Sequence, residues 1–362
     1  MSLVVKIKKQ LDNFLLDTDI EADDEVLALS GMSGAGKTMT LKCIAGIEKA
    51  DSGFISLNGR VLFDSEKKIN LSPGLRKTGY LFQDYALFPT MTARENINIV
   101  MKKNSDMTDK WLEKYGLMEV ADNLPEKLSG GQKQRIAILR IFASEPECLL
   151  LDEPFSALDE HIKRKMEREL MEMLADFHKP IIFVSHNREE IYRIADRVCN
   201  IENGVTDNIR DKKEFFEKPQ TTGQAKITGC INISEIKWLD EEHVYSKQWD
   251  NVFDVAYVNK EKWHEYRYIG IFPKDIFDIS DGDDNIKRQM SAMRNDITQS
   301  DLETINRIDV VETKTTEELL DISVNCRLKN DSFITMNLPK QLYKANKINN
   351  IGILKKDIHL LG

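Results

Sequence analysis

One short segment restricts the fold of this chain more than any other feature of its sequence. Residues 31–38 read GMSGAGKT and match the pattern G-x-x-x-x-G-K-[ST]. An apolar run at 26–29 precedes the segment, and a helical pattern at 39–47 follows it. In that context the glycines let backbone N–H groups converge on phosphate oxygens, and the helix N-terminus adds a positive dipole. The sequence therefore predicts a strand–loop–helix unit that holds the phosphates of a nucleotide.

This phosphate loop also predicts individual roles. Lys37 is expected to reach the β- and γ-phosphates, and the hydroxyl of Thr38 is expected to ligate Mg²⁺. The predicted nucleotide-binding residues of the loop are Gly31, Met32, Ser33, Gly34, Ala35, Gly36, Lys37 and Thr38.

A second segment carries acids where a buried strand ends. Residues 149–154 read LLLDEP, so Asp152 and Glu153 follow directly on three leucines. A deeply buried strand rarely ends in two carboxylates without a task, because burying a charge is costly. Asp152 fits a second Mg²⁺-linked position, reached through water, and Glu153 is placed to polarise an attacking water.

A third segment offers a second helix N-terminus. Ser129, Gly130, Gly131 and Gln132 precede a helical run at 133–142 and expose backbone donors that suit another phosphate. One chain does not need two such sites for one triphosphate. The economical explanation is that this segment closes on the γ-phosphate held by the phosphate loop of a second copy.

The ordered set of motifs resembles the ATPase subunit of ABC transporters over about residues 1–215. LSGGQ lies between the phosphate loop and LLLDEP, and Ser185-His186 follows. The resemblance implies ATP and Mg²⁺ as cofactors. It also implies that Gln83 contacts Mg²⁺ and water, that His186 contacts the γ-phosphate, and that Asp159, in the segment 156–159, crosses a dimer interface.

These roles give three predicted groups of site residues. The catalytic group is Glu153, His186 and Gln83. The metal group is Thr38, Gln83 and Asp152, and Asp159 joins the nucleotide-binding residues. The family usually stacks an aromatic ring on adenine. Phe14 is the only aromatic residue before the phosphate loop, and it is equally consistent with a place in the core, so the adenine contact stays unassigned.

The pattern of apolar runs predicts an α/β fold with two domains. Residues 1–215 are expected to form an ABC ATPase domain, with a mixed sheet core and a helical subdomain at about 84–145. After residues 203–204, Gly and Pro residues and short alternating segments replace the earlier strand and helix pattern, which places the domain boundary near 205–225. Residues 225–362 are expected to form a β-rich regulatory domain of two similar OB-like lobes, because 269–276 and 351–358 share I-G-I-x-x-K-D-I. Chance similarity over this short stretch is the alternative.

Two classes of function fit the motor motifs. The first is the ATP-hydrolysing subunit of an importer, and the second is a soluble ABC-type ATPase. The chain carries a single cassette, and its net charge of −9 disfavours nucleic acid. The importer class is therefore preferred.

Within the importers, the closest resemblance is to molybdate importer ATPases. It rests on residues 57–62, Asp64, 71–73, 79–84 and 87–89, whereas GIFPKDI in the C-terminal part resembles the regulatory domain of the wider group of importers of oxyanions, sugars and some metals. It implies that ATP-driven dimer closure is coupled to uptake of an oxyanion, molybdate or tungstate, and that the C-terminal lobes could bind that oxyanion. Sulfate, ferric iron, polyamines and sugars stay open as cargo.

The same resemblance implies partners and a location. We expect a homodimer, membrane permease subunits and, indirectly, an extracytoplasmic binding protein. No run approaches the roughly 20 apolar residues of a membrane span, no secretory signal begins the sequence, and five scattered cysteines suit a reducing compartment. The expected place is the cytoplasmic face of the cell membrane. Tyr85, Leu87 and Phe88 either receive a permease helix or pack within the helical subdomain.

Overall fold

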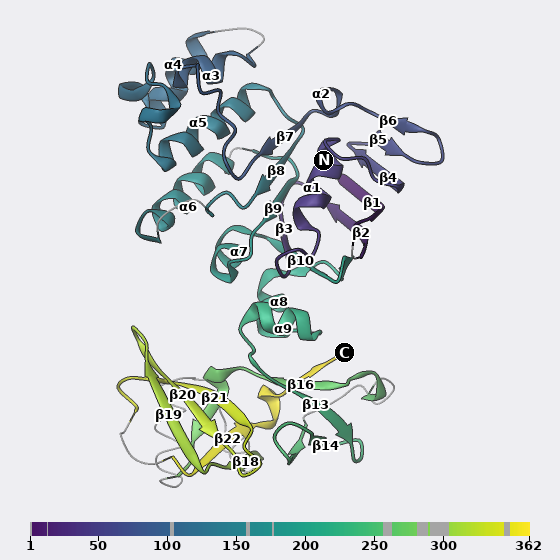
Figure 1. Cartoon of the computed structure of the whole chain (residues 1–362), viewed down its shortest axis with the longest axis vertical. Coiled ribbons are helices and arrows are strands. Elements are labelled where there is room, and N and C mark those ends of the chain that lie inside the picture. The colour runs from purple at the N-terminus through teal and green to yellow at the C-terminus, as the bar shows by residue number, and fades with distance from the viewer. Residues whose placement is uncertain are drawn as a thin grey trace. The chain divides into compact units, whose positions relative to one another are not determined.

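The computed structural model describes residues 2–12, 14–101, 105–156, 160–175, 177–255, 263–280, 289, 304–343 and 348–362. The chain divides into two compact units, Met1–Phe215 and Phe216–Gly362 (Figure 1). Among the described residues, no helix has the length and the apolar character that crossing a bilayer requires.

The N-terminal unit is built on a mixed sheet of 12 strands. Its order is β6-β5-β4-β1-β2-β11-β10-β3-β9-β8-β7, and β12 pairs with β10. The antiparallel strands are β1 (Leu3–Gln10), β2 (Leu15–Ala22), β4 (Ser52–Leu57), β5 (Arg60–Asp64) and β6 (Ile69–Asn70). The parallel strands are β3 (Val26–Ser30), β7 (Thr78–Leu81), β8 (Cys148–Asp152), β9 (Ile181–Val184) and β10 (Arg197–Glu202). Two short strands, β11 (Val205–Thr206) and β12 (Arg210–Asp211), pair with β10.

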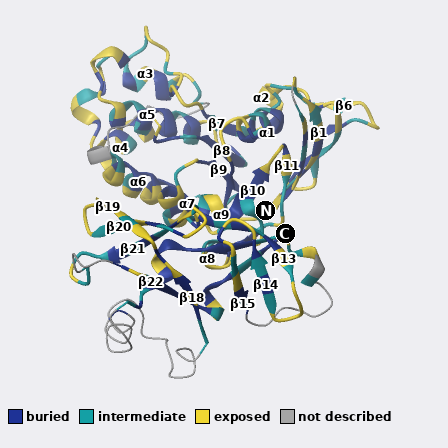
Figure 2. Cartoon of the chain, turned by 60° about the horizontal axis from the view of Figure 1, so that its bottom comes forward, coloured by how far each residue is buried: buried dark blue, intermediate teal, exposed yellow. Residues whose placement is uncertain are grey.

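Burial explains why the two halves of the sheet differ in sequence. Every residue of β8 and β9 is buried, as expected of parallel strands covered on both faces. In β1, buried and more exposed positions largely alternate, which suits a strand with one face towards solvent. Figure 2 shows the contrast as dark blue along β8 and β9 against yellow on the outer sides of the helices. A single apolar core extends from β1 and β4 to β3 and to α1 (Lys37–Ala45).

Helices surround the parallel part of the sheet. Three of them, α3 (Ala93–Asn98), α4 (Ser105–Lys114) and α5 (Gly130–Ala143), gather at the end of the unit away from β1 and β4, and α3 packs on α5 (Figure 1). The other helices are α2 (Pro73–Arg76), α6 (Glu160–Leu174) and α7 (Arg188–Ile194). Short 3-10 turns lie at Met118–Val120 and Pro125–Lys127.

The C-terminal unit is rich in strands. The helix α8 (Lys212–Glu217) begins in the N-terminal unit and ends in the C-terminal unit, and α9 (Thr222–Thr228) follows it. The sheets are five-stranded β15-β14-β13-β16-β23, three-stranded β17-β22-β18 and three-stranded β19-β20-β21. The strands are β13 (Asn232–Trp238), β14 (His243–Ser246), β15 (Asn251–Asp254), β16 (Tyr268–Ile271), β17 (Ile276–Asp278), β18 (Ile305–Asp309), β19 (Glu312–Glu317), β20 (Asp321–Arg327), β21 (Phe333–Pro339), β22 (Asn350–Leu354) and β23 (His359–Leu361).

The two repeated I-G-I-x-x-K-D-I segments have matching structures, and the strands of one copy pair with the strands of the other. Each forms a strand, a 3-10 turn and a second strand: β16, Pro273–Asp275 and β17 in the first copy, and β22, Lys355–Asp357 and β23 in the second. β16 pairs with β23, and β17 pairs with β22, both antiparallel. The register corresponds as well, since Gly270 lies opposite His359 and its counterpart Gly352 lies opposite Phe277. Residues of both copies therefore share one apolar core.

Candidate functional site

The phosphate loop joins β3 to α1, and glycines make its path possible. Gly36 is the N-cap of α1 and has a φ of 108°. A Cβ there would lie 2.6 Å from Cδ1 of Leu16, and a Cβ on Gly31, whose φ is 148°, would lie 2.4 Å from the carbonyl oxygen of Ile201. A larger residue at either position would clash, and its backbone would be strained. The loop can therefore follow this course only with glycine at both positions.

The ammonium group of Lys37 lies over its own loop. Its Nζ donates hydrogen bonds to the carbonyl oxygens of Gly31, at 2.8 Å, and Met32, at 3.0 Å. Burial lowers the pKa of Lys37, although the charges of Glu153 and Asp152 act in the opposite direction. The group thus provides positive charge at the centre of the phosphate loop.

Asp152, the last residue of β8, is held by two hydroxyl groups. Thr38 Oγ1 donates to its Oδ1 at 2.9 Å, and Tyr80 Oη donates to its Oδ2 at 2.8 Å. The pKa of Tyr80 is raised, first by burial and then by the charge of Asp152, so the phenol keeps its proton.

These oxygens fit a magnesium ion. A hydroxyl and a carboxylate are hard ligands of the kind that Mg²⁺ takes from a protein when substrate phosphates and waters supply the rest. The described residues contain no cluster of three or more His, Cys, Asp or Glu side chains that could form an all-protein cage. Gln83 lies in the exposed turn after β7, and no hydrogen bond joins it to Thr38 or Asp152 in the described part of the chain.

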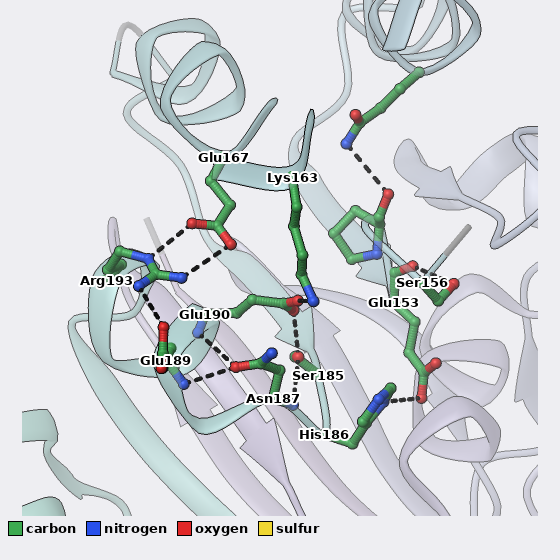
Figure 3. Close-up of polar contacts among 12 residues, drawn as sticks. Glu153, Ser156, Lys163, Glu167, Ser185, His186, Asn187, Glu189, Glu190 and Arg193 are labelled. Carbon is green, nitrogen blue, oxygen red and sulfur yellow. Dashed lines mark hydrogen bonds and ion pairs between the residues drawn. The ribbon is translucent and has the colours of Figure 1, made fainter. Parts of the chain in front are cut away.

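Glu153 and His186 face each other across the ends of β8 and β9 (Figure 3). His186 Nδ1 lies 3.3 Å from Glu153 Oε1. Glu153 has a φ of 46°, which is uncommon for a residue with a side chain, and its N–H donates to the carbonyl oxygen of Val184 at 3.1 Å. Such backbone strain often occurs at functional sites. The imidazole is 64% exposed, so it remains accessible to a ligand.

A buried polar network lies behind His186 (Figure 3). Ser185 Oγ donates to Glu190 and accepts a hydrogen bond from the N–H of Asn187. Glu190, only 4% exposed, also forms an ion pair with Lys163 of α6. This network fixes the backbone on both sides of His186. No signal in the sequence marks Lys163 or Glu190, because charged residues on a helix ordinarily indicate a solvated face.

Ser129 begins α5 with a reciprocal capping arrangement. Its Oγ accepts from the N–H of Gln132 at 3.3 Å, and its own N–H donates to Gln132 Oε1 at 2.8 Å. Within the part of the chain that the structure describes, no hydrogen bond donated by the Ser129 hydroxyl is found, so its proton is available to an external acceptor. Gly130 is exposed, whereas Gly131 is buried, and a Cβ on Gly131 would lie 2.3 Å from Sδ of Met166 in α6.

The remaining predicted positions differ in how far they are buried, and some of them are not described. Ala157, Leu158 and Asp159 lie outside the described residues. Tyr85 is buried, and its Oη donates to the carbonyl oxygen of Pro154 at 3.4 Å, so it packs inside the unit; Leu87 is half-buried.

Two further aromatic residues remain accessible. Phe88 is 45% exposed, beneath the guanidinium group of Arg140. Phe14 is half-buried, and its ring lies next to Gly36 and Gly204.

Together, the loop, the paired acids and the serine-capped helix define a P-loop ATP-binding cassette. Residues 16–156 match the family model described as ABC transporter. The predictions of an α/β cassette and of its family are confirmed for these residues.

Proteins with known names match about half or more of the chain. The molybdenum import ATP-binding protein ModC of Haemophilus influenzae is 40% identical over 219 residues, which cover 60% of this chain and 62% of that protein. The Escherichia coli K12 protein of the same name is 44% identical over 180 residues, with coverages of 49% and 51%. The chain thus spans less than two thirds of these relatives' length. A solved structure of a dimeric ATP-binding cassette bound to ADP and phosphate matches with a TM-score of 0.49 and 22% identity. The match covers 59% of this chain and 99% of that chain.

Proposed function

We propose that this chain is the ATP-hydrolysing motor subunit of an ABC importer. One observation carries the proposal: Thr38 donates to Asp152 at the end of β8, immediately beside the pair formed by Glu153 and His186. A phosphate loop, metal-binding oxygens, a candidate base and a histidine therefore meet at one edge of the parallel sheet. That set is suited to hydrolysis of a bound triphosphate.

The residues divide the hydrolysis step among them. The loop N–H groups and Lys37 bind the phosphates, and Thr38, Asp152 and Gln83 would hold Mg²⁺, which neutralises charge on the phosphates when it is bound. Water attacks the γ-phosphorus while the bond to the β-phosphate oxygen breaks, and the water proton passes to the Glu153 carboxylate. His186 donates a hydrogen bond to the γ-phosphate oxygens.

A second copy of the chain completes the site in this proposal. Ser129, Gly130 and Gln132 of one copy contact the γ-phosphate held by the other, and Asp159 lies at the interface. ATP favours the closed dimer because it makes these contacts only there. Phe14 is the aromatic residue proposed to contact adenine, since its ring lies next to Gly36.

Transport requires membrane permease subunits, and the chain would act at the cytoplasmic face of the membrane. The turn of Gln83 and the exposed ring of Phe88 are the proposed contacts. Relatives named as molybdenum import proteins, at 40% and 44% identity, favour molybdate or tungstate as cargo. Sulfate, ferric iron, polyamines and sugars are the alternatives, and a soluble ATPase is the alternative class.

Glu153→Gln tests the motor role. The variant should bind ATP and Mg²⁺, should hydrolyse ATP about 10² to 10⁴ times more slowly, and should elute as an ATP-dependent dimer in gel filtration. Glu126→Gln, an exposed change on the same unit, should behave as wild type. Normal hydrolysis by Glu153→Gln would remove the assigned base.

Reconstitution with the permease tests the cargo. In proteoliposomes, a binding protein loaded with molybdate should stimulate ATPase activity, and the same protein offered sulfate should not. Stimulation by a different cargo alone would redirect the assignment while leaving the motor role intact.

A further inference from the structure

Tyr80 forms a hydrogen bond with Asp152 that the sequence does not predict. Its Oη donates to Asp152 Oδ2 at 2.8 Å, and Thr38 donates to the other oxygen, Oδ1, at 2.9 Å. One side of the carboxylate therefore faces the hydroxyl proposed to ligate Mg²⁺, and Tyr80 holds the opposite side.

The geometry of two parallel strands explains how Tyr80 reaches this position. Tyr80 of β7 lies opposite Leu150 of β8 in the register. Asp152 follows two residues later, so its side chain emerges on the same face of the sheet as that of Leu150. The ring of Tyr80 packs on the core that contains Leu150, and its hydroxyl extends along the strand to the carboxylate. The ring of Phe82 also contacts that of Tyr80, with centroids 4.4 Å apart.

From this arrangement we infer that Tyr80 is a positioning residue for the magnesium site. Its hydroxyl fixes the rotation of the Asp152 carboxylate, so that Oδ1 stays directed towards Thr38 and the metal. The inference rests on the proposed function, because it concerns the Mg²⁺ that accompanies ATP. Outer-shell partners of metal ligands commonly change metal affinity by about 10- to 100-fold when they are removed.

The test is Tyr80→Phe in the full chain, which keeps the ring and removes the hydroxyl. Binding of the non-hydrolysable analogue AMP-PNP is titrated at a series of Mg²⁺ concentrations and again in EDTA. The variant should match wild type in EDTA, and should need about 10-fold more Mg²⁺ for the same gain in nucleotide affinity. This readout measures binding and does not depend on turnover.

Two controls separate positioning from packing. Tyr245→Phe removes an equivalent hydroxyl–carboxylate bond, to Asp250 at 2.6 Å in the C-terminal unit, and should leave the Mg²⁺ dependence unchanged. Gly79→Ala disturbs the packing of β7 but keeps the Tyr80 hydroxyl, and should not shift the Mg²⁺ requirement selectively. Melting temperatures of all variants are compared to verify folding.

The outcomes are distinct. If wild type shows Mg²⁺-dependent binding and Tyr80→Phe needs no more Mg²⁺, the inference fails and the proposed function stands. The inference is also overturned if Tyr80→Phe loses nucleotide affinity equally with and without Mg²⁺, or if Gly79→Ala shows an equal shift in its Mg²⁺ requirement. Either result would make Tyr80 a packing residue. If wild type binds no nucleotide, the proposed function and the inference fall together.

Discussion

Lys37 Nζ lies 2.8 Å from the carbonyl oxygen of Gly31, the first residue of its own phosphate loop. The ammonium group is therefore held against the carbonyl groups of the loop, with a second hydrogen bond to Met32. A bound phosphate would replace carbonyl acceptors by charged oxygens, which form stronger hydrogen bonds. The lysine is thus already in place for its proposed ligand.

Replacing Lys37 should weaken nucleotide binding strongly. A hydrogen bond to a charged group contributes about 1.5–3 kcal/mol, so Lys37→Ala should lower ATP affinity at least about 10-fold. Equilibrium binding of a fluorescent ATP analogue measures this effect. Lys42→Ala, in the last turn of the same helix, serves as the matched control and should bind normally. Unchanged affinity in Lys37→Ala would remove the phosphate-loop assignment.

Gly79→Ala should destabilise the N-terminal unit. A Cβ at this position would lie 2.3 Å from Cγ2 of Ile141 and 3.0 Å from Cδ2 of Leu149. Overpacking of this kind lowers the free energy of unfolding by about 1–3 kcal/mol. Gly74→Ala is the control, because a Cβ there has no neighbour within 4 Å. Urea unfolding of both variants gives the comparison, and equal stability would contradict the close packing of β7 on α5.

The strand exchange predicts that the C-terminal unit unfolds in one transition. Ile271 and Ile353 occupy equivalent positions in the two repeats, and both are 0% exposed. Because they belong to one core, alanine at either position should lower the stability of the whole unit by about 2–5 kcal/mol. Amide hydrogen exchange in the paired strands β16 and β23, and in β17 and β22, measures the effect. Val252→Ala, at a 46% exposed site, should change little. Exchange that rises in only one repeat would refute a shared core.

The C-terminal unit should also lose some stability as pH rises. His243 Nδ1 lies 2.7 Å from Asp240 Oδ1, and its Nε2 lies 3.2 Å from Asp254 Oδ1. The hydrogen bond to Asp240, and then the charges of Asp240 and Asp254, raise the pKa of His243. This contribution is fully present below the unfolded value of about 6.5 and is lost as pH rises through the higher folded value.

His243→Gln isolates this effect. The difference in unfolding midpoint between wild type and the variant should be largest near pH 6 and should shrink towards pH 9. A difference that stays constant over this range would show that the charge of His243 contributes nothing.

The phosphate loop and the serine-capped helix could be predicted because they are local. The local backbone requires glycine at Gly31 and Gly36, and it favours a capping serine at Ser129. Each requirement involves only a few neighbouring residues. The family prediction is confirmed for residues 16–156 for the same reason. The motifs are contiguous, and each identifies its own strand or helix.

Contacts between distant segments were not predictable in this way. The sequence does not reveal that Tyr80 reaches Asp152 or that Lys163 pairs with Glu190, because each partner has an ordinary role in its own element. It left Tyr85 with two interpretations, and burial decides for packing. The repeat predicted similar structures, but which copy supplies each strand depends on tertiary pairing alone.

The strand exchange in the C-terminal unit has a consequence for biosynthesis. β16 and β17 leave the ribosome well before β22 and β23, yet each of the earlier strands pairs with one of the later ones. This unit therefore cannot complete its sheets during most of its translation, whereas the ATP-binding cassette ahead of it already has all its strands. Until the last residues of the chain are made, β16 lacks its neighbour β23 and β17 lacks its neighbour β22.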